Sequence, residues 1–121
     1  SVNYSGYFDA RSRSITMKQI DDSVYHELGH FLAFIAGNVD KTASFQSIFA
    51  AEKANVTAFN KAYVTQNASE YFAESVKDYI LNNASLKSTR PQTYAAVQNA
   101  LNQITDAQIA KIQKIYGAFW N

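Results

Sequence analysis

At 121 residues, the chain is long enough for one domain with a modest core and too short for a second independent domain. Apolar residues make up 47% and charged residues 17%, a balance typical of globular proteins and not of disordered chains. Eleven basic and ten acidic side chains give a formal charge of +1 without a basic stripe, which argues against nucleic acid as a partner. No apolar run reaches the roughly 20 residues that span a bilayer. The absence of cysteine excludes disulfides, thiolate ligands and a cysteine nucleophile.

The first 20 residues differ in pattern from the rest. An aromatic run at residues 4–8 is followed by the polar stretch DARSRS, and apolar and polar side chains then alternate from Ile15 to Lys18. This pattern predicts a short β-hairpin with its turn near residues 9–13. We therefore expect one domain over residues 1–121, with a hairpin in residues 1–20 and helices in residues 21–121. The expected fold class is α+β, mostly α.

Two helices are predicted in the first half of the helical region. The first has apolar residues at spacings of three and four, is capped by Asp21 or Asp22, and ends at Gly37. Ser44 is expected to cap the second, which continues with a break near Asn55 to about Tyr63.

Three more helices are predicted from their start signals. Asn67 and Ser69 are turn and cap residues ahead of the third, and Pro91 suits the first turn of the fourth. The sequence TDAQ at Thr105–Gln108 resembles a capping box that opens the last helix. The apolar face of that last helix is expected to consist of Ile109, Ile112, Tyr116 and Phe119.

The stretch SVYHELGHFLAFIAGN at residues 23–38 holds the only two histidines, His26 and His30. Residues four apart on a helix stand one turn apart on the same face, so both imidazoles can converge on one metal ion. Glu27 follows the first histidine, where its carboxylate can reach a metal-bound water as a general base. Gly29 is expected to leave room beside the ion. Chance produces such a motif in on the order of one in a thousand chains of this composition.

A catalytic zinc site normally has three protein ligands, so a third ligand is needed. With no further histidine and no cysteine, it has to be a carboxylate. Glu70 and Glu74 repeat the spacing of four in the first turns of a capped helix, so one can bind the metal while the other holds a ligating imidazole. The alternative is a pair of solvated glutamates that stabilise a helix N-terminus. Glu52 is expected at the surface or in a local ion pair.

HELGH followed about 40 residues later by EYFAES resembles the anthrax lethal factor-like zinc metallopeptidases, which include the bacterial Pro-Pro endopeptidases. Both have an HExxH helix and then a tyrosine seven residues ahead of an E-[YF]-F-A-E segment. The resemblance covers roughly residues 20–80. It implies a zincin-like domain that binds one zinc ion, with Glu70 as the third ligand and Glu74 as the partner of a zinc-bound histidine. It also implies that the phenol of Tyr63 stabilises the oxyanion.

The resemblance implies a secreted bacterial zinc endopeptidase with Glu27 as general base and a protein or peptide substrate. Zincins bind substrate along an edge strand, for which the expected residues are Ile15, Thr16, Met17 and Lys18. Cleavage between prolines is one specificity in this family, but the single tryptophan, Trp120, does not match its aromatic wall. The alternative function is a catalytically silent binding or toxin module on the same scaffold. A purely structural zinc site is disfavoured because such sites have four protein ligands. A monomer is expected.

Overall fold

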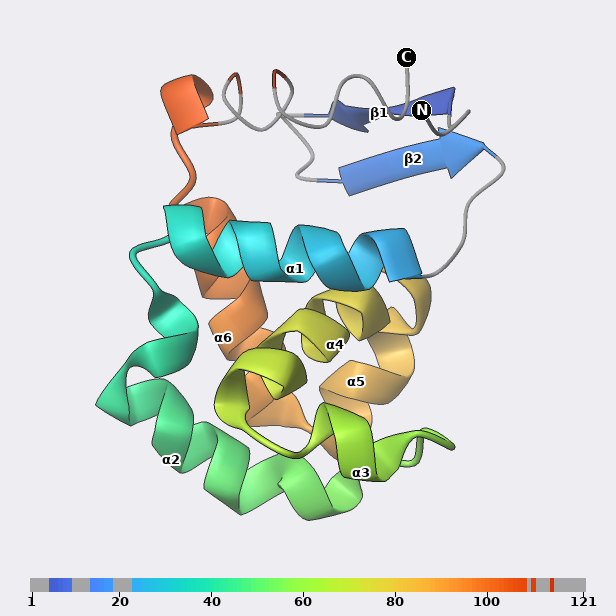
Figure 1. The fold of residues 1–121 in the computed structure, drawn as a ribbon, viewed down its shortest axis with the longest axis vertical. Helices are drawn as coiled ribbons and strands as arrows, with labels where there is room; N and C mark the ends of the chain where they lie inside the picture. Colours follow the sequence, from blue (N-terminus) through green and yellow to red (C-terminus); the bar gives the residue numbers. More distant parts are fainter. Residues whose placement is uncertain (1–4, 10–13, 19–22, 109, 111–113, 115–121) are drawn as a thin grey trace.

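A computed structural model of the chain describes residues 5–9, 14–18, 23–108, 110 and 114 (Figure 1). Near the N-terminus, strands β1 (Ser5–Asp9) and β2 (Ser14–Lys18) pair antiparallel. Ser5 stands opposite Lys18, and Asp9 stands opposite Ser14. The expected turn at residues 10–13 lies outside the described residues.

The rest of the described chain consists of helices and the connections between them. The α-helices are α1 (Ser23–Ile35), α2 (Ala43–Glu52), α3 (Lys61–Val64), α4 (Ala68–Leu81), α5 (Asn83–Thr89) and α6 (Pro91–Asn102), and the 3-10 helices are η1 (Val39–Lys41) and η2 (Lys53–Asn55). Helix α4 lies at the centre and packs most extensively against α1, with further contacts to α2, α3, α5 and α6. None of the helices in the described part of the chain is long and apolar enough to cross a membrane.

The expected α+β class is wrong, because the body of the protein is all-helical. Every residue of the described buried core lies between Tyr25 and Ile104, in helices or in the connections between them. A two-stranded ribbon is only marginally stable alone and forms no layer against which helices can pack. The helices therefore bury their apolar faces against one another, and Figure 1 shows α1 between the two strands and the other helices.

Helix α1 ends as the sequence predicts. Gly37 has a φ of 81° and Asn38 a φ of 58°, both in the left-handed region that a helix C-terminus uses. The backbone N–H of Asn38 donates to the carbonyl of Ala33 at 2.9 Å, which closes the last turn. The expected caps at its start, Asp21 and Asp22, lie outside the described residues.

The cap of α2 differs from the expectation. The Thr42 hydroxyl, and not that of Ser44, accepts the N–H of Phe45 at 3.2 Å. Both hydroxyl residues suit a cap chemically, and the choice depends on which of them has extended backbone, as Thr42 does with a ψ of 153°. The predicted break follows at η2, which ends at Asn55.

The predicted start residues of the later helices agree with the structure. Asn67 caps α4, and Pro91 is in the first turn of α6. Thr105 and Gln108 form the reciprocal capping box, with N–H to side-chain distances of 2.7 and 3.1 Å. Most of the expected last helix lies outside the described residues, including Ile109, Ile112, Tyr116, Phe119 and also Trp120. Helix α5 was not predicted, because NASLKST contains little apolar periodicity.

Candidate metal centre

Helix α1 turns one face to the core and the other to a polar site. Leu28 and Leu32 are buried, while Glu27 is exposed and His30 is partly exposed. His26 lies between these extremes, with 9% of its surface exposed. Because three and four residues make about one helical turn, the apolar spacing that buries the leucines also keeps both histidines together on the adjoining face.

The close approach of α1 and α4 depends on Gly29. A Cβ atom at this position would lie 2.7 Å from the Cα and carbonyl oxygen of Ala73 in α4. The expectation that Gly29 leaves room beside a metal ion is therefore wrong, since its missing side chain instead admits the backbone of the neighbouring helix. This packing brings the histidine face of α1 within side-chain reach of α4.

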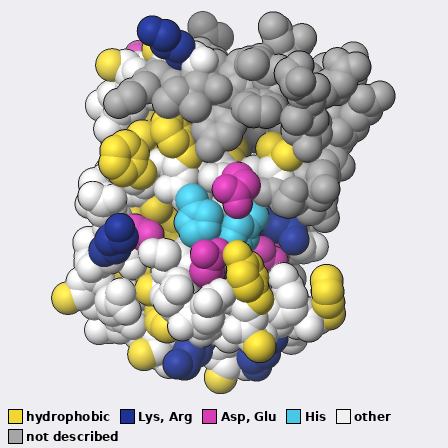
Figure 2. Space-filling view, viewed as in Figure 1, with side chains coloured by type: hydrophobic (Ala, Val, Ile, Leu, Met, Phe, Trp, Pro, Cys, Tyr) yellow, Lys and Arg dark blue, Asp and Glu magenta, His cyan; other side chains and the backbone are white. Residues whose placement is uncertain are grey.

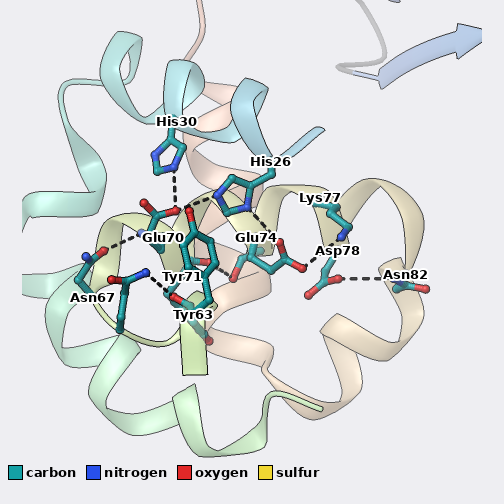
Figure 3. A network of polar contacts seen from close by, with 12 residues as sticks. His26, His30, Tyr63, Asn67, Glu70, Tyr71, Glu74, Lys77, Asp78 and Asn82 are labelled. Atoms are coloured by element: carbon teal, nitrogen blue, oxygen red, sulfur yellow. Dashed lines mark hydrogen bonds and ion pairs between the residues drawn. The ribbon is translucent and has the colours of Figure 1, made fainter. Parts of the chain in front are cut away.

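Helix α4 presents two carboxylates to that face. Asn67 fixes the start of the helix, because its side chain accepts the N–H of Glu70 at 2.8 Å. Glu70 therefore stands in the first turn and Glu74 one turn later, both directed toward α1 (Figure 3). The alternative of two solvated glutamates does not hold, because both side chains contact the histidines.

One oxygen of Glu70 contacts both histidines. Its Oε1 lies 2.9 Å from Nε2 of His26 and 3.1 Å from Nε2 of His30 (Figure 3). In a tetrahedral zinc site with ligands at ~2.0–2.1 Å, ligand atoms stand about 3.3 Å apart. The oxygen therefore needs to move away from each nitrogen by only about 0.2–0.4 Å for both pairs to match a zinc-sized ion.

The protonation of His26 provides a further test of metal fit. Its Nδ1 lies 3.0 Å from Oε1 of Glu74, while its Nε2 faces Glu70. An imidazole between two carboxylates either carries two protons or donates from one nitrogen and binds a cation with the other. Without a metal, the hydrogen bond to Glu74 raises the pKa of His26 above its ordinary value, even though burial opposes this. The residues therefore fit a divalent metal bound at Nε2.

The two carboxyl groups are held in the ionised form that a metal site needs. Burial pushes the pKa of Glu70 upward, but hydrogen bonds from His26 and His30 outweigh it, and the net shift is downward. The pKa of Glu74 is also lowered, first by the hydrogen bond from His26 and then by the charge of Lys77, against the effect of burial.

Glu27 is a second carboxylate near the same point. The ligand atoms of His26, Glu27 and His30 all lie within 4.8 Å of one another, so these three residues could also hold an ion. One Glu70 oxygen lies at hydrogen-bond distance from both imidazoles, at 2.9 and 3.1 Å. Glu70 and Glu27 are therefore both candidates for a third ligand, and Glu27 is the exposed one of the two.

Tyr63, on the short helix α3, borders the site. Its ring centroid lies 6.2 Å from that of His26, and about half of its surface is exposed. The negative charge of Glu70 raises the pKa of the phenol above its ordinary value of 10.0. The Tyr63 hydroxyl therefore stays protonated at neutral pH and can donate a hydrogen bond.

The whole group opens onto one face of the molecule. Figure 2 shows both histidines at the surface, with acidic side chains above and below them. The expected substrate residues Ile15, Thr16, Met17 and Lys18 all lie in β2. Their role in binding substrate stays a prediction.

The contacts of two residues, Lys77 and Glu52, were not predicted from the sequence. The Nζ atom of Lys77 lies 3.3 Å from Oε2 of Glu74. The only feature of the sequence that could have predicted this contact is the position of Lys77, three residues after Glu74.

Glu52 was expected at the surface or in a local ion pair, and this expectation is wrong. It is buried and accepts hydrogen bonds from the backbone N–H groups of Gln92 and Thr93 at 3.0 and 2.8 Å, and from the Thr93 hydroxyl at 2.7 Å.

Comparison with known proteins gives two matches. The family model described as anthrax toxin lethal factor, N- and C-terminal domain, matches residues 10–100. A protein named Pro-Pro endopeptidase from Clostridioides difficile (strain 630) is 41% identical over 78 residues, which cover 61% of this chain and 34% of that protein. The matched region thus spans about a third of the relative's length. No solved structure matches the chain.

Proposed function

The chain belongs to the anthrax lethal factor family, and on that premise we propose that it hydrolyses peptide bonds with a zinc ion held by His26, His30 and Glu70. The observation that carries the proposal is the position of one Glu70 oxygen, 2.9 and 3.1 Å from the Nε2 atoms of both histidines. Two helices separated by more than thirty residues thus bring three suitable ligand atoms together. Two imidazoles and a carboxylate leave a fourth position open, as catalytic zinc sites do.

Bound zinc would supply a Lewis acid that polarises the scissile carbonyl and acidifies water at neutral pH. Glu27 takes the proton of the attacking water, and it later gives this proton to the leaving amine. Its exposure suits this role, because a general base has to reach both water and substrate. The attack forms one C–O bond, and the C–N bond of the peptide then breaks. The proton that water loses is the one that the leaving amine gains, so no other proton donor is needed.

Tyr63 donates its hydroxyl proton in a hydrogen bond to the carbonyl oxygen as negative charge develops there. Two observations support this role: the ring lies beside His26, and Glu70 keeps the phenol protonated by raising its pKa. Glu74 accepts the Nδ1 proton of His26 and thereby directs the Nε2 lone pair toward the metal.

The substrate class that we propose is peptides with consecutive prolines. The support is the 41% identity to a protein named Pro-Pro endopeptidase. Proline has no backbone N–H and a fixed φ, so a site that accepts it on both sides of the scissile bond differs from that of a general peptidase. Secretion by a bacterium stays a prediction.

The test is incubation of the protein with a degenerate peptide pool, with matched peptides that contain a proline pair, and with a zinc chelator in a parallel sample. We expect cleavage between the prolines, about one zinc per chain by elemental analysis, and loss of both cleavage and metal on chelation. Zinc-loaded protein that cleaves no peptide would instead favour the silent binding module. Cleavage that survives complete removal of the metal would exclude the zinc mechanism.

A further inference from the structure

Glu74 uses both of its carboxylate oxygens, each toward a different partner. Oε1 lies 3.0 Å from Nδ1 of His26, and Oε2 lies 3.3 Å from Nζ of Lys77. Lys77 is three residues further along α4, so it approaches the carboxylate from the side away from the histidine (Figure 3). The contacts therefore form a chain that runs from Lys77 through Glu74 to His26.

The second contact restricts how the carboxylate can turn. The last torsion of a glutamate side chain has broad preferences, so a carboxylate held at one oxygen only can still rotate about it. A cation at Oε2 opposes this rotation and keeps Oε1 in line with the Nδ1 proton of His26. The Glu74 side chain is only 8% exposed and that of Lys77 is 23% exposed, so water screens this pair less than a surface ion pair.

The other nearby cation does not serve this purpose. Arg90 is buried, and its guanidinium contacts Asp78 at 2.6 Å and the Ser75 hydroxyl at 3.4 Å. Asp78 and Arg90 thus neutralise each other. Among the lysines and arginines of the described part of the chain, Lys77 is the one found in contact with Glu74.

We propose that Lys77 is a positioning residue for the metal site, which holds the Glu74 carboxylate so that it orients the imidazole of His26. The proposal rests on the proposed function, because it takes His26 to be a metal ligand. It assigns to Lys77 a role outside the set of ligands, base and phenol that the family resemblance implies. The expected consequence of losing Lys77 is weaker metal binding by a folded protein.

The experiment measures the zinc dissociation constant of the full chain by competition with a chromophoric chelator. Lys77→Met keeps most of the length of the side chain and removes its charge, and we expect it to weaken zinc binding about three- to fivefold. Lys77→Arg should restore affinity to within about twofold of the original protein. Lys41→Met, at an exposed lysine on η1, is the matched control and should leave the affinity unchanged.

A double-mutant cycle separates positioning from a general effect of charge or stability. Glu74→Gln alone should weaken zinc binding about ten- to a hundredfold. If Lys77 acts through Glu74, adding Lys77→Met to Glu74→Gln should cost little more. An undiminished effect of Lys77→Met in the Glu74→Gln background would overturn the proposal, as would a Lys77→Met protein with unchanged affinity.

The outcomes also separate this proposal from the proposed function. If the original chain binds no zinc, the zinc mechanism itself fails. If the original chain binds zinc and Lys77→Met binds it equally well, only the positioning role fails. Thermal unfolding of each metal-free variant provides the check on folding, and we expect Lys77→Met to unfold within about 4 °C of the original protein.

Discussion

Two carboxylates of this protein are almost equally buried, yet they have different partners. Glu74 is 6% exposed and Glu52 is 5% exposed. Glu74 faces a histidine and a lysine, whereas Glu52 faces two backbone N–H groups and a hydroxyl at the start of α6. The partners of Glu52 are neutral hydrogen-bond donors, which do not titrate near neutral pH. Burial of a charge therefore does not by itself identify a functional site, whereas the chemistry of its partners does.

The largest effect is expected for a substitution in the candidate metal centre. Glu70→Ala removes the oxygen that contacts both histidines, so metal content should fall from about one zinc per chain to nearly none and peptide cleavage should become undetectable. Elemental analysis after desalting measures this. Glu74→Gln is the matched control, since it should retain measurable zinc. If Glu70→Ala still holds zinc firmly, Glu27 or another carboxylate is the third ligand.

Glu27→Ala should separate chemistry from binding. We expect kcat/KM for peptide cleavage to fall about 10²- to 10⁴-fold while zinc content stays unchanged, because the general base is lost and the ligands remain. Steady-state kinetics and metal analysis on the same preparation provide the measurement. Full activity in this variant would remove Glu27 from the mechanism.

Substitution of Glu52 should change the stability of the fold and leave metal binding unchanged. Glu52→Ala leaves three donors, two of them buried, without their acceptor, and we expect it to lower the free energy of unfolding by about 2–4 kcal/mol. Glu52→Gln keeps one acceptor oxygen and should cost less. Chemical denaturation of the metal-free protein measures both values. A selective loss of zinc affinity in a stably folded Glu52 variant would contradict a purely structural role for Glu52.

Gly29→Ala should destabilise the protein although alanine is the better helix former. On an exposed helix the substitution would add up to about 1 kcal/mol of stability. Here the new methyl group meets the backbone of Ala73 at 2.7 Å and has to push α1 and α4 apart, so we expect a net loss of about 1–3 kcal/mol. Zinc affinity should fall as well, since the helices carry the ligands. A gain in stability would show that α1 and α4 can move apart without a loss of packing energy.

The smallest expected effect is the pH dependence of the metal-free protein. The raised pKa of His26 stabilises the fold below its ordinary value of 6.5, and this contribution is lost as pH rises through the folded-state pKa. The lowered pKa of Glu74 stabilises the fold above its ordinary value of 4.5, and this contribution is lost on acidification. The unfolding temperature should therefore be highest between about pH 4.5 and 6.5 and lower by roughly 2–5 °C at pH 8.

Glu74→Gln is the informative variant for this measurement, because it removes the partner that raises the pKa of His26 most. Its unfolding temperature should vary less between pH 6 and 8 than that of the original protein. A metal-free protein that becomes more stable over the same interval would contradict the pairing of His26 with the two carboxylates.

Much of the site could be predicted because its signals are local. The spacing of His26 and His30 is a property of one helix, and the Asn67 cap that directs Glu70 lies only three residues before it. The contact of Lys77 with Glu74 is also local to α4, whereas the environment of Glu52 depends on contacts between distant segments. Glu52 meets Gln92 and Thr93 only when α2 packs beside α6, across some forty residues of chain.

The expected fold class failed for a related reason. The alternation from Ile15 to Lys18 is a local pattern, but the class of a fold depends on which elements form the core. The described core is drawn from helices and their connections, which the hairpin pattern could not reveal. The choice of Thr42 over Ser44 as a cap likewise depends on a backbone angle that neighbouring packing sets.

The sequence by itself determined the chemistry of this protein: two imidazoles one helical turn apart, a carboxylate between them, and a pair of glutamates on a second, capped helix. Each of these features follows from helical geometry within a few residues. Only the tertiary structure decided which glutamate oxygen meets both histidines, which glutamate contacts Nδ1 of His26, and that Gly29 serves helix packing. Such choices depend on how two helices approach each other, and that approach is set by packing across the whole core.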